Sequence, residues 1–209
     1  MRGDALAAAV GQPAPHFTLP SVQGPTIDLK SYEGRRSVIV WFSRGFTCPF
    51  CRGYMQGVIE GYQSLLAQAT EVIQVTPNLL ESARRFFRPD PVPYPVVCDP
   101  DKRLYAVYGL GDRGVLAATR AGVVSFAVSF TTGDTGPQLR GAWHDVVNRN
   151  FLRRLHHHAS TALEQGLFLI DRGGTIRHRA VIGPLEPIPA GPELVALARA
   201  HAPDGQPAA

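Results

Sequence analysis

The chain has 209 residues, enough for one sizeable hydrophobic core, and 44% of them are hydrophobic, as in an ordinary globular protein. Its net charge of +4 is carried mainly by arginine without a basic run interleaved with aromatic residues, so we expect a solvated surface and no nucleic-acid partner. Three cysteines are too few for a disulfide scaffold, and without a secretory leader pattern or a long apolar stretch we expect a cytoplasmic protein that makes no membrane contact.

The first half of the chain predicts strands and helices in alternation. Prolines extend residues 11–20, where apolar and polar residues alternate as in a short strand, and residues 21–36 are turns and short pieces. Residues 37–42 form a buried-type strand, and a helix runs from near Cys48 to about Gln68. Glycines at 53, 57 and 61 give this helix one bare face, which serves for close packing or weakens the helix.

The later elements follow the same rhythm and end in a hairpin. Residues 71–76 are a second buried strand, 79–88 an amphipathic helix, and 93–98 a third strand whose prolines place it at a sheet edge. Asp99 caps a helix that reaches Tyr108 and stops at Gly109. Further strands are predicted at 166–171 and 175–181, joined by a turn at 172–174, and a terminal helix at 193–200. The pattern is that of an α/β layer fold.

The most informative motif is C-x-x-C at Cys48 and Cys51. An apolar run ends in Trp41 and Phe42, a short glycine-containing loop follows, and the motif opens the predicted helix, which is the setting in which two such thiols do redox chemistry. The unpaired N–H groups at the start of a helix favour negative charge, so a cysteine there ionises more easily to the attacking thiolate.

Two other interpretations of the motif stay open beside the redox one. Half of a zinc site needs two more ligands, but the chain offers only Cys98 and scattered histidines, so we expect no metal. A purely structural disulfide would close a very short loop and constrain the unfolded chain little. We therefore prefer the redox interpretation.

Several short sequence motifs, together with their order along the chain, resemble the redoxin family, which is also called the alkyl hydroperoxide reductase and thiol-specific antioxidant group. They are G-x-x-A-P-x-F-x-L-P from Gly11, the Tyr32-Glu33-Gly34 turn, Y-P-V-V-C-D-P-D from Tyr94, Tyr108-Gly109-Leu110 and the strand that begins at Gly166. The resemblance implies a thioredoxin-like fold, a central mixed sheet flanked by helices, as a single domain over residues 8–203. Residues 111–160 do not fit the rhythm, and we interpret them as an insertion that covers the active site or pairs subunits. Residues 204–209 are expected to be a flexible tail.

The active-site string departs from the peroxiredoxin pattern P-x-x-x-T-x-x-C. If Cys51 takes the peroxidatic position, Arg44 stands at the proline position and Cys48 at the threonine position. Gln165 stands where that family has a later arginine that polarises the peroxide. The C-x-x-C itself looks like that of thioredoxin, although thioredoxin's proline before the facing strand would fall near Gly166. The supporting site residues we predict are Arg44, Thr47, Arg52 and Gln165.

Three functions fit these residues. The preferred one is a thiol–disulfide oxidoreductase in which Cys48 attacks and Cys51 resolves, with a disulfide substrate or a thiol reductant as partner. The second is a thiol peroxidase, in which Cys51 attacks a hydroperoxide and Cys48 resolves the sulfenic acid. The third is a non-catalytic redox sensor. None requires a cofactor, and the apolar run in the insertion predicts a homodimer.

Four further positions have a structural and a functional interpretation. Cys98 is a packed thiol or a second resolving thiol, and we prefer the packed one. Residues 156–158 are three consecutive histidines, which point in different directions on a helix and so suit a surface patch better than a metal site. Trp41 is either core or a shield for the thiols, and Asp171 is expected to be a turn residue rather than a proton carrier.

Overall fold

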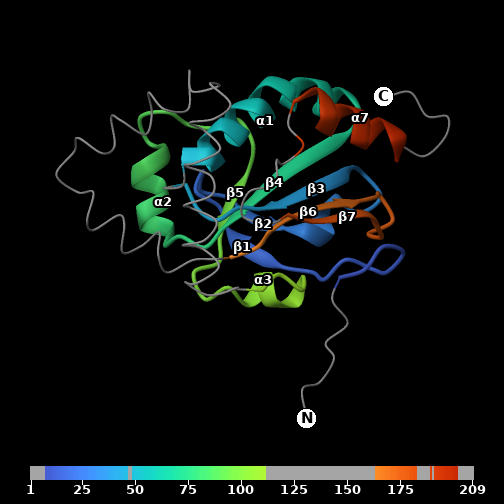
Figure 1. Ribbon diagram of the computed structural model, residues 1–209, viewed down its shortest axis with the longest axis horizontal. Coiled ribbons are helices and arrows are strands. Elements are labelled where there is room, and N and C mark those ends of the chain that lie inside the picture. The colour runs from blue at the N-terminus through green and yellow to red at the C-terminus, as the bar shows by residue number, and fades with distance from the viewer. Residues whose placement is uncertain (1–7, 47–48, 112–162, 183–188, 190, 202–209) are drawn as a thin grey trace, which may run out of the picture.

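The computed structural model describes residues 8–46, 49–111, 163–182, 189 and 191–201, apart from the side chains of residues 49–53. Its central sheet has the strand order β5-β4-β3-β6-β7 (Figure 1). The strands are β3 (Ser37–Phe42), β4 (Thr70–Thr76), β5 (Val96–Cys98), β6 (Gln165–Ile170) and β7 (Ile176–Ile182). Strand β4 runs parallel to β3 and to β5, whereas β6 is antiparallel to β3 and to β7. The mixed sheet expected from the sequence is therefore confirmed.

Helices cover both faces of this sheet (Figure 1). The first face carries α1 (Pro49–Ala67), α2 (Leu80–Phe87) and α7 (Pro192–Ala200). The second carries α3 (Arg103–Val107), the hairpin of β1 (Thr18–Pro20) and β2 (Thr26–Asp28), and the short 3₁₀-helix η1 (Leu29–Tyr32). Strand β3 serves both, because alternate side chains point to opposite faces: Ile39 and Trp41 belong to the apolar cluster of the first face, while Val38, Val40 and Phe42 belong to that of the second.

Two of the expected elements are shorter than the sequence suggested. Strand β5 begins only at Val96, because Pro93 and Pro95 have no N–H group to give to a sheet ladder. It is the edge strand, and Val22 donates its N–H to the Val96 carbonyl on the outer side. Helix α3 begins at Arg103 rather than at the expected cap, since the Asp99 carboxylate accepts N–H groups from residues 103–105 across an intervening turn.

The bare face of α1 serves for close packing. A Cβ atom added to Gly61 would lie 3.0 Å from the carbonyl oxygen of Gly191, directly before α7. The two backbones thus approach too closely for a side chain at this point. Gly57 lies on the same side, with its carbonyl oxygen 3.4 Å from the position of a Cβ on Gly191. This contact fixes the last helix against the first long one.

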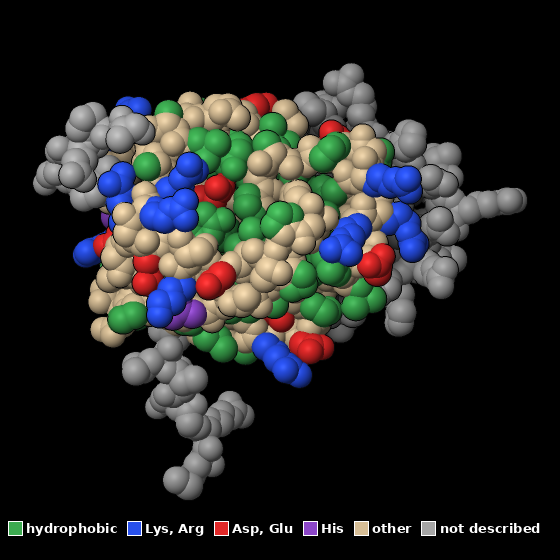
Figure 2. Space-filling view, turned by 180° about the vertical axis from the view of Figure 1, so that it is seen from behind, with side chains coloured by type: hydrophobic (Ala, Val, Ile, Leu, Met, Phe, Trp, Pro, Cys, Tyr) green, Lys and Arg blue, Asp and Glu red, His purple; other side chains and the backbone are tan. Residues whose placement is uncertain are grey.

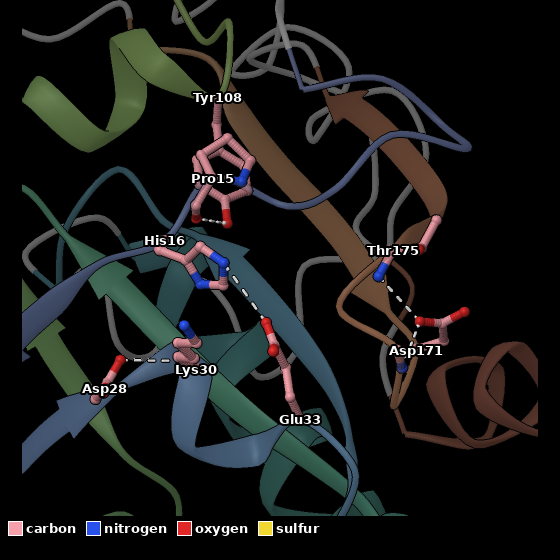
Figure 3. A network of polar contacts seen from close by, with 9 residues as sticks. Pro15, His16, Asp28, Lys30, Glu33, Tyr108, Asp171 and Thr175 are labelled. Atoms are coloured by element: carbon pink, nitrogen blue, oxygen red, sulfur yellow. Dashed lines mark hydrogen bonds and ion pairs between the residues drawn. The ribbon is translucent and has the colours of Figure 1, made fainter.

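The N-terminal segment is fastened to the β6–β7 hairpin by hydrogen bonds. Gly11 donates to the Ile176 carbonyl at 2.8 Å, and Ala14 donates to the Gly174 carbonyl at 2.8 Å. Figure 3 shows the polar contacts around this segment, including the Tyr108 hydroxyl that donates to the Pro15 carbonyl at 2.8 Å. The N-terminal segment is therefore held against the end of the central sheet.

Charged side chains on the face seen in Figure 2 stand in small groups of mixed sign. That face carries no continuous basic stripe. Among the residues that the structure describes, no helix is long and apolar enough to cross a membrane. Residues 112–162, which hold nearly all of the predicted insertion and its three histidines, lie outside the described residues, and so does the expected tail at 204–209.

Replacing Gly61 with alanine tests the glycine contact. Alanine usually stabilises a helix by about 0.5–1 kcal/mol relative to glycine. Here its Cβ would force backbone atoms apart, an overpacking cost of about 1–3 kcal/mol, so we expect net destabilisation of about 1 kcal/mol in urea unfolding. Ser64→Ala, an exposed position on the same helix, is the control and should change little. Stabilisation by Gly61→Ala would contradict the close contact.

Candidate active site

The turn that follows β3 leaves the sheet through a buried polar cluster. Ser43 continues the pairing with β4, since its N–H donates to the Val75 carbonyl at 2.9 Å. Its hydroxyl donates to the same carbonyl at 3.1 Å and accepts from the Gln74 amide at 3.2 Å. The Tyr105 hydroxyl, from α3, lies 2.5 Å from the Ser43 carbonyl oxygen and 3.0 Å from that of Val75. These hydrogen bonds hold the backbone at Ser43, two residues before Gly45, from both faces of the sheet.

Aromatic packing holds the next part of the turn. The Phe46 side chain is buried, and its ring is stacked on that of Phe86 with 4.4 Å between ring centroids. Phe87 meets the Phe46 ring edge-on at 5.9 Å. Both partners belong to α2, so the chain is anchored to this helix two residues before Cys48.

The predicted thiols follow this anchor directly. Helix α1 begins at Pro49, a residue that suits the first helical position, and Cys51 lies in its first turn. The prediction that the motif opens a helix is therefore confirmed for Cys51. Cys48 and Thr47 lie outside the described residues, and the structure describes no side chain for Cys51 or Arg52. The predicted roles of these four residues stay predictions.

Arg44 connects the turn to the residues that follow the predicted insertion. Its Nε donates to the Leu163 carbonyl at 3.0 Å. One residue further, Glu164 donates its N–H to the Gly111 carbonyl at 2.9 Å and accepts the Gly111 N–H on its carboxylate at 3.0 Å. Gly111 is the first residue of the predicted insertion and residues 163–164 follow it, so the described residues on either side of positions 112–162 meet beside the turn after β3.

Gln165 lies on the strand next to this turn. It is the first residue of β6, is 2% exposed, and precedes Gly166, which pairs with Phe42. A Cβ on Gly166 would come within 2.7 Å of the Phe168 ring and 2.8 Å of Leu110, so a larger residue there would have to displace these two side chains. Gln165, which stands at the expected arginine position, is thus a buried amide. It lies at the same end of the central sheet as the carboxyl end of β3.

Cys98 is a packed thiol in the structure. It is the last residue of β5, pairs with Thr76, and is 5% exposed. Burial raises the pKa of the Cys98 thiol to about 11, although the nearby Arg84 charge acts to lower it. A thiol held protonated in this way is a poor nucleophile, which agrees with the preferred structural role.

Two other sequence candidates also have structural roles. Trp41 is 1% exposed and belongs to the apolar cluster under α1. Asp171 accepts N–H groups from Gly173 and Thr175, and Figure 3 shows its turn. Burial of Asp171 raises its pKa, but the hydrogen bonds from Thr175 and Arg177 outweigh burial and leave the pKa below its usual value. Because Val38 pairs with Ile170, this turn lies at the opposite end of β3 from the thiols.

Comparison with known proteins gives one matching family model and relatives of two kinds. The model described as "AhpC/TSA family" matches residues 10–179. The putative peroxiredoxin Rv2521 of Mycobacterium tuberculosis is 28% identical over 115 residues, 54% of this chain and 73% of that protein. The thiol-disulfide oxidoreductase ResA of Halalkalibacterium halodurans is 28% identical over 108 residues, 51% of this chain and 60% of that protein.

Solved structures agree on the fold. The crystal structure of a putative thiol:disulfide interchange protein DsbE from Chlorobium tepidum is similar with a TM-score of 0.58 and 18% identity, covering 94% of this chain and 99% of that one. At this identity the likeness shows the fold alone, which is the thioredoxin-like fold expected from the sequence.

The buried state of Cys98 predicts very slow alkylation. In the Cys48→Ser/Cys51→Ser variant only this thiol remains, and with a pKa of about 11 only about 0.1% of it is thiolate at pH 8. We expect iodoacetamide to modify it roughly 100-fold more slowly in the folded protein than in urea, as followed by intact mass. Equal rates in the two states would contradict the packed position.

Proposed function

Because the chain belongs to the AhpC/TSA family, we propose that it is a thiol–disulfide oxidoreductase that uses Cys48 and Cys51 as a dithiol–disulfide couple. Both kinds of relative bear names of thiol-dependent oxidoreductases. The two relatives named above therefore share one enzyme class. The residues of the candidate site distinguish disulfide chemistry from peroxide chemistry.

The observation that carries the proposal is the position of the second cysteine. Cys51 lies in the first turn of α1, directly beyond the carboxyl end of the central strand β3. Cys48 is three residues earlier in the sequence, next to the N–H groups that a helix start leaves without partners. Partial positive charge at this end favours the thiolate form of Cys48 over that of a cysteine further into the helix.

The reaction takes place in two exchanges. The Cys48 thiolate attacks one sulfur of a substrate disulfide, the substrate S–S bond breaks, and the second substrate sulfur leaves as a thiolate. The Cys51 thiolate then attacks the Cys48 sulfur, which closes the Cys48–Cys51 disulfide and releases the first substrate sulfur. Two electrons pass to the substrate, and a thiol reductant returns the protein to the dithiol.

The residues around the turn favour this chemistry over peroxide cleavage. A peroxidase needs donors aimed at the oxygen on which charge develops, and each such donor typically contributes about 10²–10³ in rate. Gln165 carries no charge where the family has arginine, and Cys48 replaces the threonine. Arg44 stands at the proline position, and its Nε donates to the Leu163 carbonyl.

Thiol peroxidase is the second candidate, since the relative Rv2521 is named a putative peroxiredoxin. Here the Cys51 thiolate attacks the O–O bond, forms a sulfenic acid, and the alkoxide leaves and takes up a proton. Cys48 then condenses with the sulfenic acid, which forms the disulfide and releases water. The two candidates thus exchange the roles of the same two cysteines.

The proposal also includes the location, the domain extent and the oligomeric state expected from the sequence. A cytoplasmic location would keep the resting dithiol reduced. Residues 8–203 would form one redoxin domain, with residues 111–160 as an insertion that makes the contact of a homodimer. Light scattering at high protein concentration tests the dimer, and a monomer would refute that part of the proposal.

Single cysteine variants separate the two candidates. We expect Cys51→Ser to accumulate a stable mixed disulfide on Cys48 when it is mixed with a small disulfide, because no resolving thiol remains. Cys48→Ser should form no such adduct. Intact mass and peptide mapping record both results. Rapid sulfenic acid formation on Cys51 in Cys48→Ser, with no disulfide adduct in either variant, would favour the peroxidase.

Peroxide turnover provides the complementary measurement. We expect the wild-type dithiol to react with hydrogen peroxide about 10²-fold or more slowly than a dedicated peroxiredoxin under the same conditions, because the arginine and threonine donors are missing. Stopped-flow fluorescence or competition against a reference peroxidase measures this rate. A rate equal to that of the reference would show that another residue replaces these donors.

A further inference from the structure

We propose that Asn78 is a positioning residue for the redox turn: its side-chain amide holds the backbone at Phe46 and thereby sets the reactivity of Cys48. The inference rests on the proposed role of Cys48 as the attacking thiol. It assigns a function to a residue whose place in the sequence, after Pro77 at the end of a strand, marks only the end of that strand.

The side-chain carbonyl oxygen of Asn78 connects two segments that are distant in the sequence, the turn after β3 and the end of β4. Oδ1 accepts the Phe46 N–H at 3.3 Å and the Thr76 hydroxyl at 2.6 Å. A backbone N–H can only donate, so the contact with Phe46 requires an acceptor and fixes which end of the amide faces the turn. Thr76 is fully buried at the end of β4 and provides the rigid side of the bridge.

Gly45 shows that the turn is shaped around this amide. A Cβ on Gly45 would lie only 2.7 Å from Asn78 Oδ1, closer than real Cβ contacts. The φ angle of Gly45 is +110°, a conformation that disfavours any residue with a side chain. Both the backbone conformation and the space thus require glycine exactly where Asn78 lies against the turn.

Contacts on the other side leave the turn little freedom to move. The Phe46 ring is stacked on Phe86 of α2, the helix that begins just after Asn78. The turn therefore contacts Asn78 through its backbone and helix α2 through the Phe46 side chain. Of these, only the contact with Asn78 acts on the backbone that continues into Cys48.

The position of this backbone matters for the reactivity of the thiol. The stabilisation of a thiolate by the start of a helix is confined to the first turn, so it depends on where the sulfur lies. Displacements of about 1 Å at a reacting group cost up to 10²-fold in rate. Without Asn78, the Phe46 N–H loses its acceptor and the turn loses the hydrogen bond that ties its backbone to the end of β4.

The test measures the pH dependence of Cys48 alkylation by iodoacetamide. The parent is Cys51→Ser/Cys98→Ser, in which Cys48 is the remaining thiol. We expect Asn78→Ala to raise the apparent thiol pKa and to slow alkylation at neutral pH about tenfold, the change expected for losing one positioning hydrogen bond. Thermal unfolding of each variant shows whether it remains folded.

Gln23→Ala is the matched control. The Gln23 amide also bridges two backbone groups, accepting the Val96 N–H at 3.2 Å and donating to the Tyr94 carbonyl at 2.9 Å. Its loss should lower stability but leave the pH profile of Cys48 unchanged. Asn78→Asp keeps the acceptor oxygen and adds a negative charge, so its rate should approach that of the parent as salt screens the charge. The rate of Asn78→Ala should not recover with salt.

A double-mutant cycle tests the contact between Gly45 and Asn78 directly. Gly45→Ala should slow Cys48 alkylation in the parent, because its Cβ pushes the amide away and because alanine disfavours a φ of +110°. In the Asn78→Ala background the same change should have a smaller effect, since the obstructing oxygen is gone, so the two effects should not be additive.

The outcomes separate this inference from the proposed function. An ordinary pKa for Cys48 in the parent would overturn the proposed role of Cys48 and the inference together. A lowered pKa in the parent that Asn78→Ala and Asn78→Asp leave unchanged would overturn the inference alone. Additive effects of Gly45→Ala and Asn78→Ala would also overturn it.

Discussion

The parallel pairing of β3 with β4 is the constraint on which the candidate site depends. It brings the carboxyl ends of both strands to one edge of the sheet, with Phe42 opposite Val75. The chain must turn there in a buried environment, where unpaired backbone groups are costly. Ser43 and Tyr105 satisfy these groups around the Val75 carbonyl, and the turn then enters α1 at a fixed point. The position of the C-x-x-C motif follows from that geometry.

The same edge also holds the described residues on either side of positions 112–162. Gly166 on β6 pairs with Phe42, and the pairing of Gly111 with Glu164 closes the base of the segment between them. Arg44 connects this base to the redox turn through the Leu163 carbonyl. The hairpin turn at Asp171 and the attached N-terminal segment lie at the opposite end of β3. Both have structural roles. The candidate site and the hairpin turn thus lie near opposite ends of β3.

The parts of the structure that could be predicted from the sequence are those determined by residues close together in the chain. The apolar run of β3, the start of α1 and the spacing of Gly57 and Gly61 are visible without any partner, and all were confirmed. The role proposed for Asn78 was not foreseen, because it arises only when β4 pairs beside β3 and brings residues 45–46 against 76–78. Tyr105 was predicted as a helical residue, yet its hydroxyl contact with Ser43 depends on α3 packing across the sheet.

The central claim is that Cys48 and Cys51 form a reversible dithiol–disulfide couple, and a redox titration of the wild-type protein tests it most directly. The protein is equilibrated in glutathione buffers of graded ratio, quenched with acid, and its free thiols are mapped by mass. The account predicts one two-electron transition, in which the thiols of Cys48 and Cys51 disappear together while Cys98 stays reduced. A transition that involves Cys98, or stable glutathione adducts in place of an internal disulfide, would contradict it.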